Sequence, residues 1–222
     1  METGIIEARL LARLRELGNR KRADWDKNYQ KSSWEHWGVG APQMTLAIRE
    51  GLGSASEDIL PISVRLWREP VWDLKIVAVR MLARKSVAPS EAVWQFVLDR
   101  MADLDGWAVA DCMADVAKRC LTADPRRLDI VESWVESPHL WTRRAALVFT
   151  LPWTKNGESP ERMLGWAARL STDPEWFIQK AIGWWLRELS KRNPERVRRF
   201  LAEQGGPLKG VARREASKYL GQ

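Results

Sequence analysis

The chain has few of the residues from which proteins build metal sites and disulfides. Its 222 residues include only 2 histidines, His36 and His139, and 2 cysteines, Cys112 and Cys120. The cysteines lie eight residues apart on one expected helix, too far for a disulfide along a continuous helix. Neither pair has the spacing of a zinc ligand set. We therefore expect reduced, buried thiols, structural histidines, no metal and no cofactor.

Long apolar runs are also missing. Residues 1–17 alternate Leu or Ile with Arg and Glu, without the continuous apolar segment of a signal peptide. The longest apolar run, around residues 145–153, is too short and too interrupted to span a bilayer. These absences predict a cytoplasmic protein with no membrane partner. We also expect a monomer.

Acidic residues are outnumbered, with 29 Asp and Glu against 36 Lys and Arg and a net charge of +7. This moderate excess favours an anionic partner without choosing among nucleic acid, membrane and acidic protein. From residue 187 onward there are 10 Lys or Arg and 4 Asp or Glu. Such a run is usually a solvated face, but contact with phosphates is plausible for five of these residues: Lys191, Arg192, Arg196, Arg198 and Arg199.

Tyrosine and phenylalanine are scarce as well, at 2 and 4 residues, whereas tryptophan occurs 14 times. So many indoles suggest that some form a surface for stacking on a flat partner. Tryptophan at helical spacing is more often core, and we expect this for five: Trp67, Trp72, Trp94, Trp134 and Trp166.

Helix start signals occur along almost the whole chain, and the two-residue alternation typical of strands is rare. Helix starts are indicated where a capping residue precedes proline or a helix former, at Ser90, Ser137, Ser159, Asp173 and Asn193. Between them run segments of ordinary helix length, and residues 31–40 read as a loop. No long linker divides the chain, so we predict one domain over residues 1–222.

The helices also repeat. Trp72, Trp107, Trp141 and Trp176 recur at intervals of 35, 34 and 35 residues, and Trp37 extends the series by another 35. Periods in this range are typical of two-helix units stacked as a solenoid, in which each unit buries its apolar face against its neighbours. The sequence therefore predicts an all-α superhelix of helical repeats.

Residues in the same phase of successive repeats would line one side of such a superhelix. Trp107 and Asp111 lie four residues apart and share one helix face. The corresponding later pairs are Trp141 with Arg144 and Lys180 with Trp184. We expect a basic concave groove that carries indoles and a single acid, with Trp184 in the groove and Trp185 turned away from it.

At these residues the sequence resembles the DNA alkylation-repair glycosylases of the AlkD type, which are built from HEAT-like repeats. The resemblance runs from about residue 29 to the helix that follows residue 193. It is carried by Leu66-Trp67, residues 73–82, the Trp107-x-x-x-Asp111 pair, residues 141–146 and, most specifically, residues 177–184. The chain departs from the family pattern at Ala41 and at Gln43-Met44, where the family tends to have Thr and Arg.

The resemblance implies hydrolysis of the N-glycosidic bond of purines alkylated at N3 or N7 in double-stranded DNA. By position it implies catalytic roles for Trp107, Asp111 and Trp184, and a DNA-backbone contact for Arg144 and Arg187. Lys180 and Arg143 are the further DNA-binding candidates. The family does not insert a flipped base into a tight pocket, unlike glycosylases in general.

Two other functions fit the same residues. A catalytically silent relative could bind damaged or branched DNA through the same basic face. A HEAT-like scaffold could instead bind an acidic protein, in which case the acid between the tryptophans would have no catalytic role.

Overall fold

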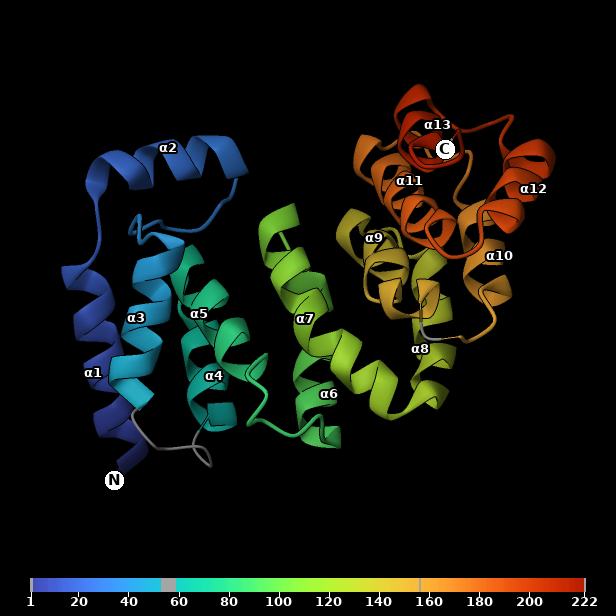
Figure 1. Cartoon of the computed structure of the whole chain (residues 1–222). Coiled ribbons are helices and arrows are strands. Elements are labelled where there is room, and N and C mark those ends of the chain that lie inside the picture. The colour runs from blue at the N-terminus through green and yellow to red at the C-terminus, as the bar shows by residue number, and fades with distance from the viewer. Residues whose placement is uncertain (1, 53–58, 156, 222) are drawn as a thin grey trace. The chain divides into compact units, whose positions relative to one another are not determined.

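The structure is a computed structural model that describes residues 2–52, 59–155 and 157–221. Within these ranges the chain consists of helices and the loops between them (Figure 1), which confirms the all-α prediction. The elements up to the middle of the chain are α1 (Glu2–Glu16), α2 (Arg20–Gln30), α3 (Ala41–Leu52), α4 (Ile59–Arg68), α5 (Trp72–Leu82), α6 (Glu91–Leu98), η1 (Met101–Asp103) and α7 (Trp107–Ala123). The later elements are η2 (Pro125–Arg127), α8 (Leu128–Ser133), η3 (Trp134–Glu136), α9 (Leu140–Val148), η4 (Leu151–Thr154), α10 (Glu161–Arg169), α11 (Trp176–Ser190), α12 (Pro194–Gln204) and α13 (Gly210–Ser217).

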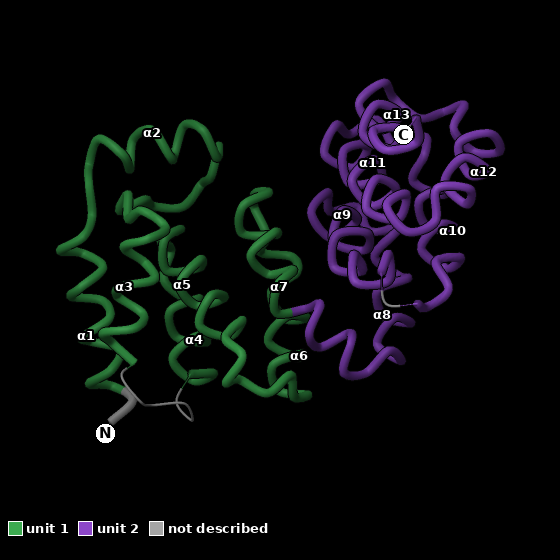
Figure 2. The backbone as a smooth tube through the Cα atoms, viewed as in Figure 1, with its two compact units in different colours: residues 1–116 green, residues 117–222 purple. Residues whose placement is uncertain are grey.

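The chain forms two compact units, residues 1–116 and residues 117–222 (Figure 2), and the boundary falls inside α7. In unit 1, α1 packs against α3 and α4 against α5, while α2 runs crosswise to α1 and α3 (Figure 1). In unit 2, α11 packs against α9, α12 and α13. The single repeat domain over residues 1–222 stays a prediction.

The tryptophan period marks equivalent helices. Trp72, Trp107 and Trp176 are the first residues of α5, α7 and α11, and Trp141 is the second residue of α9. Trp37 lies in the loop between α2 and α3, as the sequence indicates. The interval of about 35 residues therefore follows every second helix, which is the arrangement expected of two-helix repeats.

The expected capping residues act at or close to the helix starts. Ser90 accepts a hydrogen bond from the backbone N–H of Val93 at 3.4 Å, and Asn193 accepts one from that of Arg196 at 3.1 Å. The carboxylate of Asp173 accepts a hydrogen bond from the backbone N–H of Glu175 at 2.9 Å, and α11 begins at the next residue, Trp176. Such side chains satisfy N–H groups that the first turn of a helix leaves without partners.

Most of the tryptophans predicted for the core are buried. Four have exposed fractions between 1% and 7%: Trp67, Trp94, Trp134 and Trp166. Trp72 is only half-buried, because it stands at the first residue of α5 and stacks on the ring of His36, with centroids 5.0 Å apart. The core prediction is therefore confirmed for four of the five.

A buried carboxylate fastens the loop at residues 31–40 to α5. Asp73 is 1% exposed and accepts hydrogen bonds from the backbone N–H groups of Trp37 and Val39, both at 2.8 Å. Burial raises the pKa of Asp73, and the two hydrogen bonds oppose that shift because they stabilise the charged form. The loop before α3 thus depends on a residue of α5.

The centre of unit 2 is α11. Trp185 is fully buried, and its indole N–H donates to the carbonyl oxygen of Thr150 at 3.3 Å. Gln179, also fully buried, donates to the carbonyl oxygen of Ser171 at 2.9 Å and accepts from the N–H of Lys209 at 2.9 Å. These bonds fix both the position and the rotation of α11 in unit 2.

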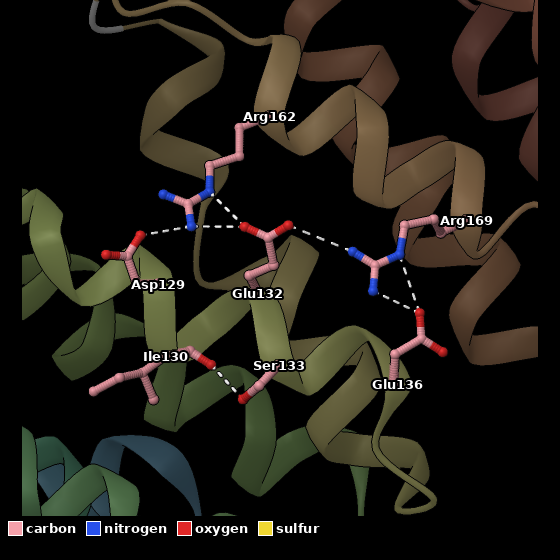
Figure 3. Close-up of polar contacts among 7 residues, drawn as sticks. All are labelled: Asp129, Ile130, Glu132, Ser133, Glu136, Arg162 and Arg169. Carbon is pink, nitrogen blue, oxygen red and sulfur yellow. Dashed lines mark hydrogen bonds and ion pairs between the residues drawn. The ribbon is translucent and has the colours of Figure 1, made fainter.

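Ion pairs join α10 to α8 and η3 (Figure 3). Arg162 contacts Asp129 and Glu132, both at 2.7 Å, and Arg169 contacts Glu132 at 3.5 Å and Glu136 at 2.6 Å. Isolated surface pairs contribute only about 0–1 kcal/mol each. Here Glu132 is shared by both arginines, so its position is restrained from two directions.

Candidate functional site

Trp107 and Asp111 lie one helical turn apart at the start of α7, as their spacing predicts. Both side chains are half-buried. The helix begins directly after Gly106, whose carbonyl oxygen accepts the N–H of Ala110 at 3.2 Å. The apolar residues between and after them, including Val109 and Met113, are fully buried and anchor α7 in unit 1. The indole and the carboxylate are thus held by a packed helix rather than by a loop.

Two exposed aromatic side chains of α2 extend the surface around Trp107. The ring of Tyr29 meets that of Trp107 edge to face, with centroids 6.2 Å apart and an interplanar angle of 90°. Trp25 stacks on Tyr29 at 4.9 Å and 13°. Their exposed fractions are 60% for Trp25 and 57% for Tyr29, which is unusual for rings of this size. Three aromatic rings therefore run in a row from α7 to the surface of α2.

Sequence reasoning did not predict a role for Trp25 or Tyr29 as functional side chains. The available signal was their spacing of four residues on a helix that also carries Arg20, Lys21, Arg22 and Lys27. Aromatic rings beside cations are typical of nucleic-acid surfaces.

One residue after Asp111, α7 contacts an arginine of α5. Arg80 is hydrogen-bonded to the thiol of Cys112, the residue that follows Asp111. Burial raises the pKa of Cys112, and the charge of Arg80 opposes that shift. Neither Cys112 nor Cys120 is in a disulfide, and the expected burial is confirmed for Cys120 but not for Cys112, which is half-buried. Arg80 thus links α5 to α7 through Cys112.

In unit 2, aromatic side chains gather at the starts of α9 and α11. Phe177 contacts Trp141 at 4.9 Å and Trp176 at 5.0 Å between ring centroids. The ammonium of Lys180 lies 4.7 Å from the ring centroid of Trp176, which is 49% exposed. The guanidinium carbon of Arg144 lies 6.0 Å from that of Trp141. Basic groups and indoles therefore occur together in unit 2, as predicted for Arg144 with Trp141, whereas the ring beside Lys180 is that of Trp176 and not that of Trp184.

Trp184 lies two turns after Trp176 on α11 and is half-buried, whereas its neighbour Trp185 is fully buried. Because Trp107 and Asp111 belong to unit 1 and Trp184 belongs to unit 2, their convergence on one nucleotide stays a prediction. The catalytic roles of the three side chains stay predictions for the same reason.

The predicted DNA-binding arginines of unit 2 differ in their exposure and in their partners. Arg144 is 5% exposed. Arg143 pairs with Asp173 at 2.9 Å and donates to the carbonyl oxygen of Ser137 at 2.8 Å, so it links the start of α9 to the segment before α11. Arg187 pairs with Glu215 and thereby ties α11 to α13. Both Arg143 and Arg187 have structural partners within unit 2, and their contact with DNA stays a prediction.

Several C-terminal basic residues are likewise paired with acids. Arg196 makes two hydrogen bonds of 2.8 Å to Glu161, and this pairing lowers the pKa of Glu161. Lys191 pairs with Glu188 at 2.8 Å. This agrees with a basic run that serves partly as a solvated, ion-paired face.

No group of three or more His, Cys, Asp or Glu side chains in the described part of the chain is arranged to hold a metal ion. None of the helices that the structure describes combines the length and the apolar composition needed to cross a bilayer.

Equivalent helices that recur at intervals of about 35 residues define a helical-repeat protein. Basic groups lie beside two of the indoles at the helix starts, Trp141 and Trp176, and this combination is typical of surfaces that bind nucleic acid. The family model for DNA alkylation repair enzymes matches residues 10–220. The chain therefore belongs to the DNA alkylation repair enzyme family, and membership implies binding to DNA.

Solved structures share this fold. A protein from Enterococcus faecalis described as a predicted DNA alkylation repair enzyme is 23% identical, with a TM-score of 0.76, covering 92% of this chain and 97% of that chain. AlkD2 from Streptococcus mutans is 22% identical, with a TM-score of 0.63, covering 92% of this chain and 100% of that chain. No curated protein sequence matches the chain.

Proposed function

We propose that the protein is a monofunctional DNA glycosylase that releases cationic purines alkylated at N3 or N7 from duplex DNA. The observation that carries the proposal is the Trp107 and Asp111 pair on the packed start of α7, in a chain that belongs to the DNA alkylation repair enzyme family. The same chemistry uses Trp184 on α11 as the second indole. We propose cytoplasmic action as a monomer, without metal or cofactor.

The reaction explains why an acid and indoles would suffice. Alkylation at N3 or N7 makes the purine a cation and a better leaving group, and departure of the base leaves positive charge on the deoxyribose. A carboxylate already in place stabilises that charge, most effectively when it is partly shielded from water. Asp111 is half-buried and meets this condition. It would also orient the water that attacks the sugar.

The indoles would flank the sugar. Their electron-rich faces attract cations, so Trp107 and Trp184 would favour the charged transition state over the neutral sugar. The edge-to-face contact with Tyr29 restrains the ring of Trp107, which reduces the entropy lost when DNA binds. Arg144 would hold a neighbouring phosphate.

The test measures release of 3-methyladenine and 7-methylguanine from alkylated duplex DNA by chromatography. Asp111→Asn removes the charge but keeps the shape, and we expect release to fall about 100-fold or more. Asp115→Asn, an exposed acid one turn further along the same helix, is the matched control and should keep wild-type activity. Wild-type protein that releases neither base, or an Asp111→Asn variant as active as Asp115→Asn, would contradict the proposed function.

A second candidate is a relative that binds DNA without releasing a base. The exposed Trp25 and Tyr29 rings favour it, because they could stack on DNA whether or not Asp111 acts. It predicts DNA binding that weakens with salt, with no base release and no effect of Asp111→Asn. Absence of DNA affinity at moderate salt would instead favour a scaffold for an acidic protein.

A further inference from the structure

A carboxylate just before α7 binds the segment that follows α2. One oxygen of Asp105 accepts hydrogen bonds from the hydroxyl of Ser32 at 2.5 Å and from the backbone N–H of Ser33 at 3.3 Å. The hydroxyl of Ser32 also accepts the backbone N–H of Trp34 at 3.2 Å, and Ser32 is buried. Asp105 therefore joins two segments that lie 73 residues apart in the chain.

A second carboxylate holds the segment before α7 from another direction. Asp103 accepts the indole N–H of Trp67, in α4, at 3.0 Å. The buried ammonium of Lys75 donates to the carbonyl oxygen of Trp67 and lies 4.9 Å from the ring centroid of Trp34. Burial lowers the pKa of Lys75, and the charges of Asp103 and Asp105 oppose that shift. A buried cation is thus attracted to both carboxylates and restrains the segment further.

These contacts reach both helices that carry the exposed aromatic row. The residue after α2, Lys31, has a φ of 53°, the left-handed conformation in which many helices end, and Ser32 follows it directly. Asp105 stands two residues before Trp107, the first residue of α7. The edge-to-face contact of Tyr29 with Trp107 spans the same two helices. The hydrogen bond from Ser32 to Asp105 and the ring contact therefore join the end of α2 to the start of α7.

We propose that Asp105 is a positioning residue, which holds the first turn of α7 so that Trp107 and Asp111 keep the geometry that base release requires. The first turn of a helix frays readily, because its backbone N–H groups lack partners within the helix. Trp107 is the first residue of α7 and Asp111 lies one turn later. A displacement of about 1 Å at a reacting group can slow a reaction about 100-fold. The effect on base release rests on the proposed function, whereas the restraint of α7 rests on contacts within unit 1 alone.

The first experiment measures hydrogen–deuterium exchange in the peptide that covers residues 107–113, after thermal unfolding has shown that each variant is folded. Asp105→Ala and Ser32→Ala remove the bond between the two segments, and we expect exchange in this peptide to rise about 10-fold. Asp105→Asn keeps an acceptor oxygen and should restore most of the protection. Ser33→Ala is the matched control, because it loses only an exposed hydroxyl and keeps the backbone N–H that donates to Asp105.

The second experiment measures base release from alkylated duplex DNA under single-turnover conditions, together with the affinity for undamaged DNA. Asp105→Ala and Ser32→Ala should lower the rate constant about 10-fold or more without changing the affinity, and Asp105→Asn should recover most of the rate. Ser33→Ala should match wild type in both.

Three results would overturn the proposal: exchange in residues 107–113 equal to that of Ser33→Ala, faster exchange spread evenly over unit 1, or faster local exchange with an unchanged rate of release. A weaker affinity for DNA at an unchanged rate would also contradict it. Faster local exchange in a protein whose wild type releases no base would support the positioning of Trp107 by Asp105 and refute only the proposed function.

Discussion

Replacing His36 with Phe should stabilise the protein, and should do so more at low pH than at high pH. His36 is 8% exposed and stacks on Trp72 with an interplanar angle of 16°. Neither of its buried ring nitrogens has a hydrogen-bonding partner among the residues that the structure describes. His36→Phe keeps a flat ring for the stack and removes both nitrogens.

The expected gain in folding stability from His36→Phe has two parts. A buried polar group without a partner costs about 1–3 kcal/mol, and this part applies at any pH. Burial also lowers the pKa of His36 below its ordinary value of 6.5, although the charge of Asp73 opposes the shift. The unfolded chain then takes up a proton before the folded protein does, so stability is lost as the pH falls below 6.5. At pH 5.5 this second part reaches at most about 1.4 kcal/mol, and at pH 7.5 it vanishes.

The assay is urea unfolding of wild type and His36→Phe at pH 7.5 and pH 5.5, with identical ionic strength. We expect the variant to be more stable at both values and the difference to widen at pH 5.5. His36→Gln, which stays polar but does not titrate, separates the two parts because it should show only the pH-dependent gain. A difference between wild type and His36→Phe that is equal at the two pH values would refute the titration argument. A less stable variant at both values would refute the cost assigned to the buried nitrogens.

Two further predictions concern packing. Gly183→Ala should destabilise unit 2 by about 1–3 kcal/mol, because a Cβ there would lie 2.9 Å from the carbonyl oxygen of Ala212 on α13. Gly165→Ala on α10 is the matched control, since a Cβ there meets no described atom within 4 Å, and should stabilise by up to about 1 kcal/mol in thermal unfolding. Asp73→Ala should lower the free energy of unfolding by roughly 2–5 kcal/mol, because it leaves the N–H groups of Trp37 and Val39 without their hydrogen-bond acceptor. Chemical unfolding measures this loss, and an Asp73→Ala protein as stable as wild type would show that other groups satisfy those N–H groups.

The helices and their repeats could be predicted because their signals are local in sequence. Ser90 and Asn193 cap helices whether or not the rest of the chain is known. The tryptophan interval could be read from four residues, and the structure places these at the starts of equivalent helices. The different burial of Trp184 and Trp185 follows from the rotation of about 100° between neighbouring residues of a helix.

Other features depend on contacts between distant segments and could not be predicted this way. The pairing of Arg143 with Asp173 joins residues 30 apart, so no local pattern favours it over contact with phosphate. A groove in unit 1 likewise brings together Arg49 of α3, Arg80 of α5 and Arg84, which follows the end of α5. Trp25 and Tyr29 gain significance only because α2 lies against the start of α7.

The burial of Trp185 also limits how the length of α11 can vary. A single deletion between Pro174 and Trp184 would turn the rest of the helix by about 100° relative to its N-terminal part. The indole that now bonds to Thr150 would then leave the core, and its neighbour would have to enter it. Homologues that keep this pair of tryptophans should therefore tolerate insertions in the loops on either side of α11 but not within its first two turns. The spacing between Trp176 and Trp184 would then be fixed by packing inside unit 2, even in a relative that had lost any activity on DNA.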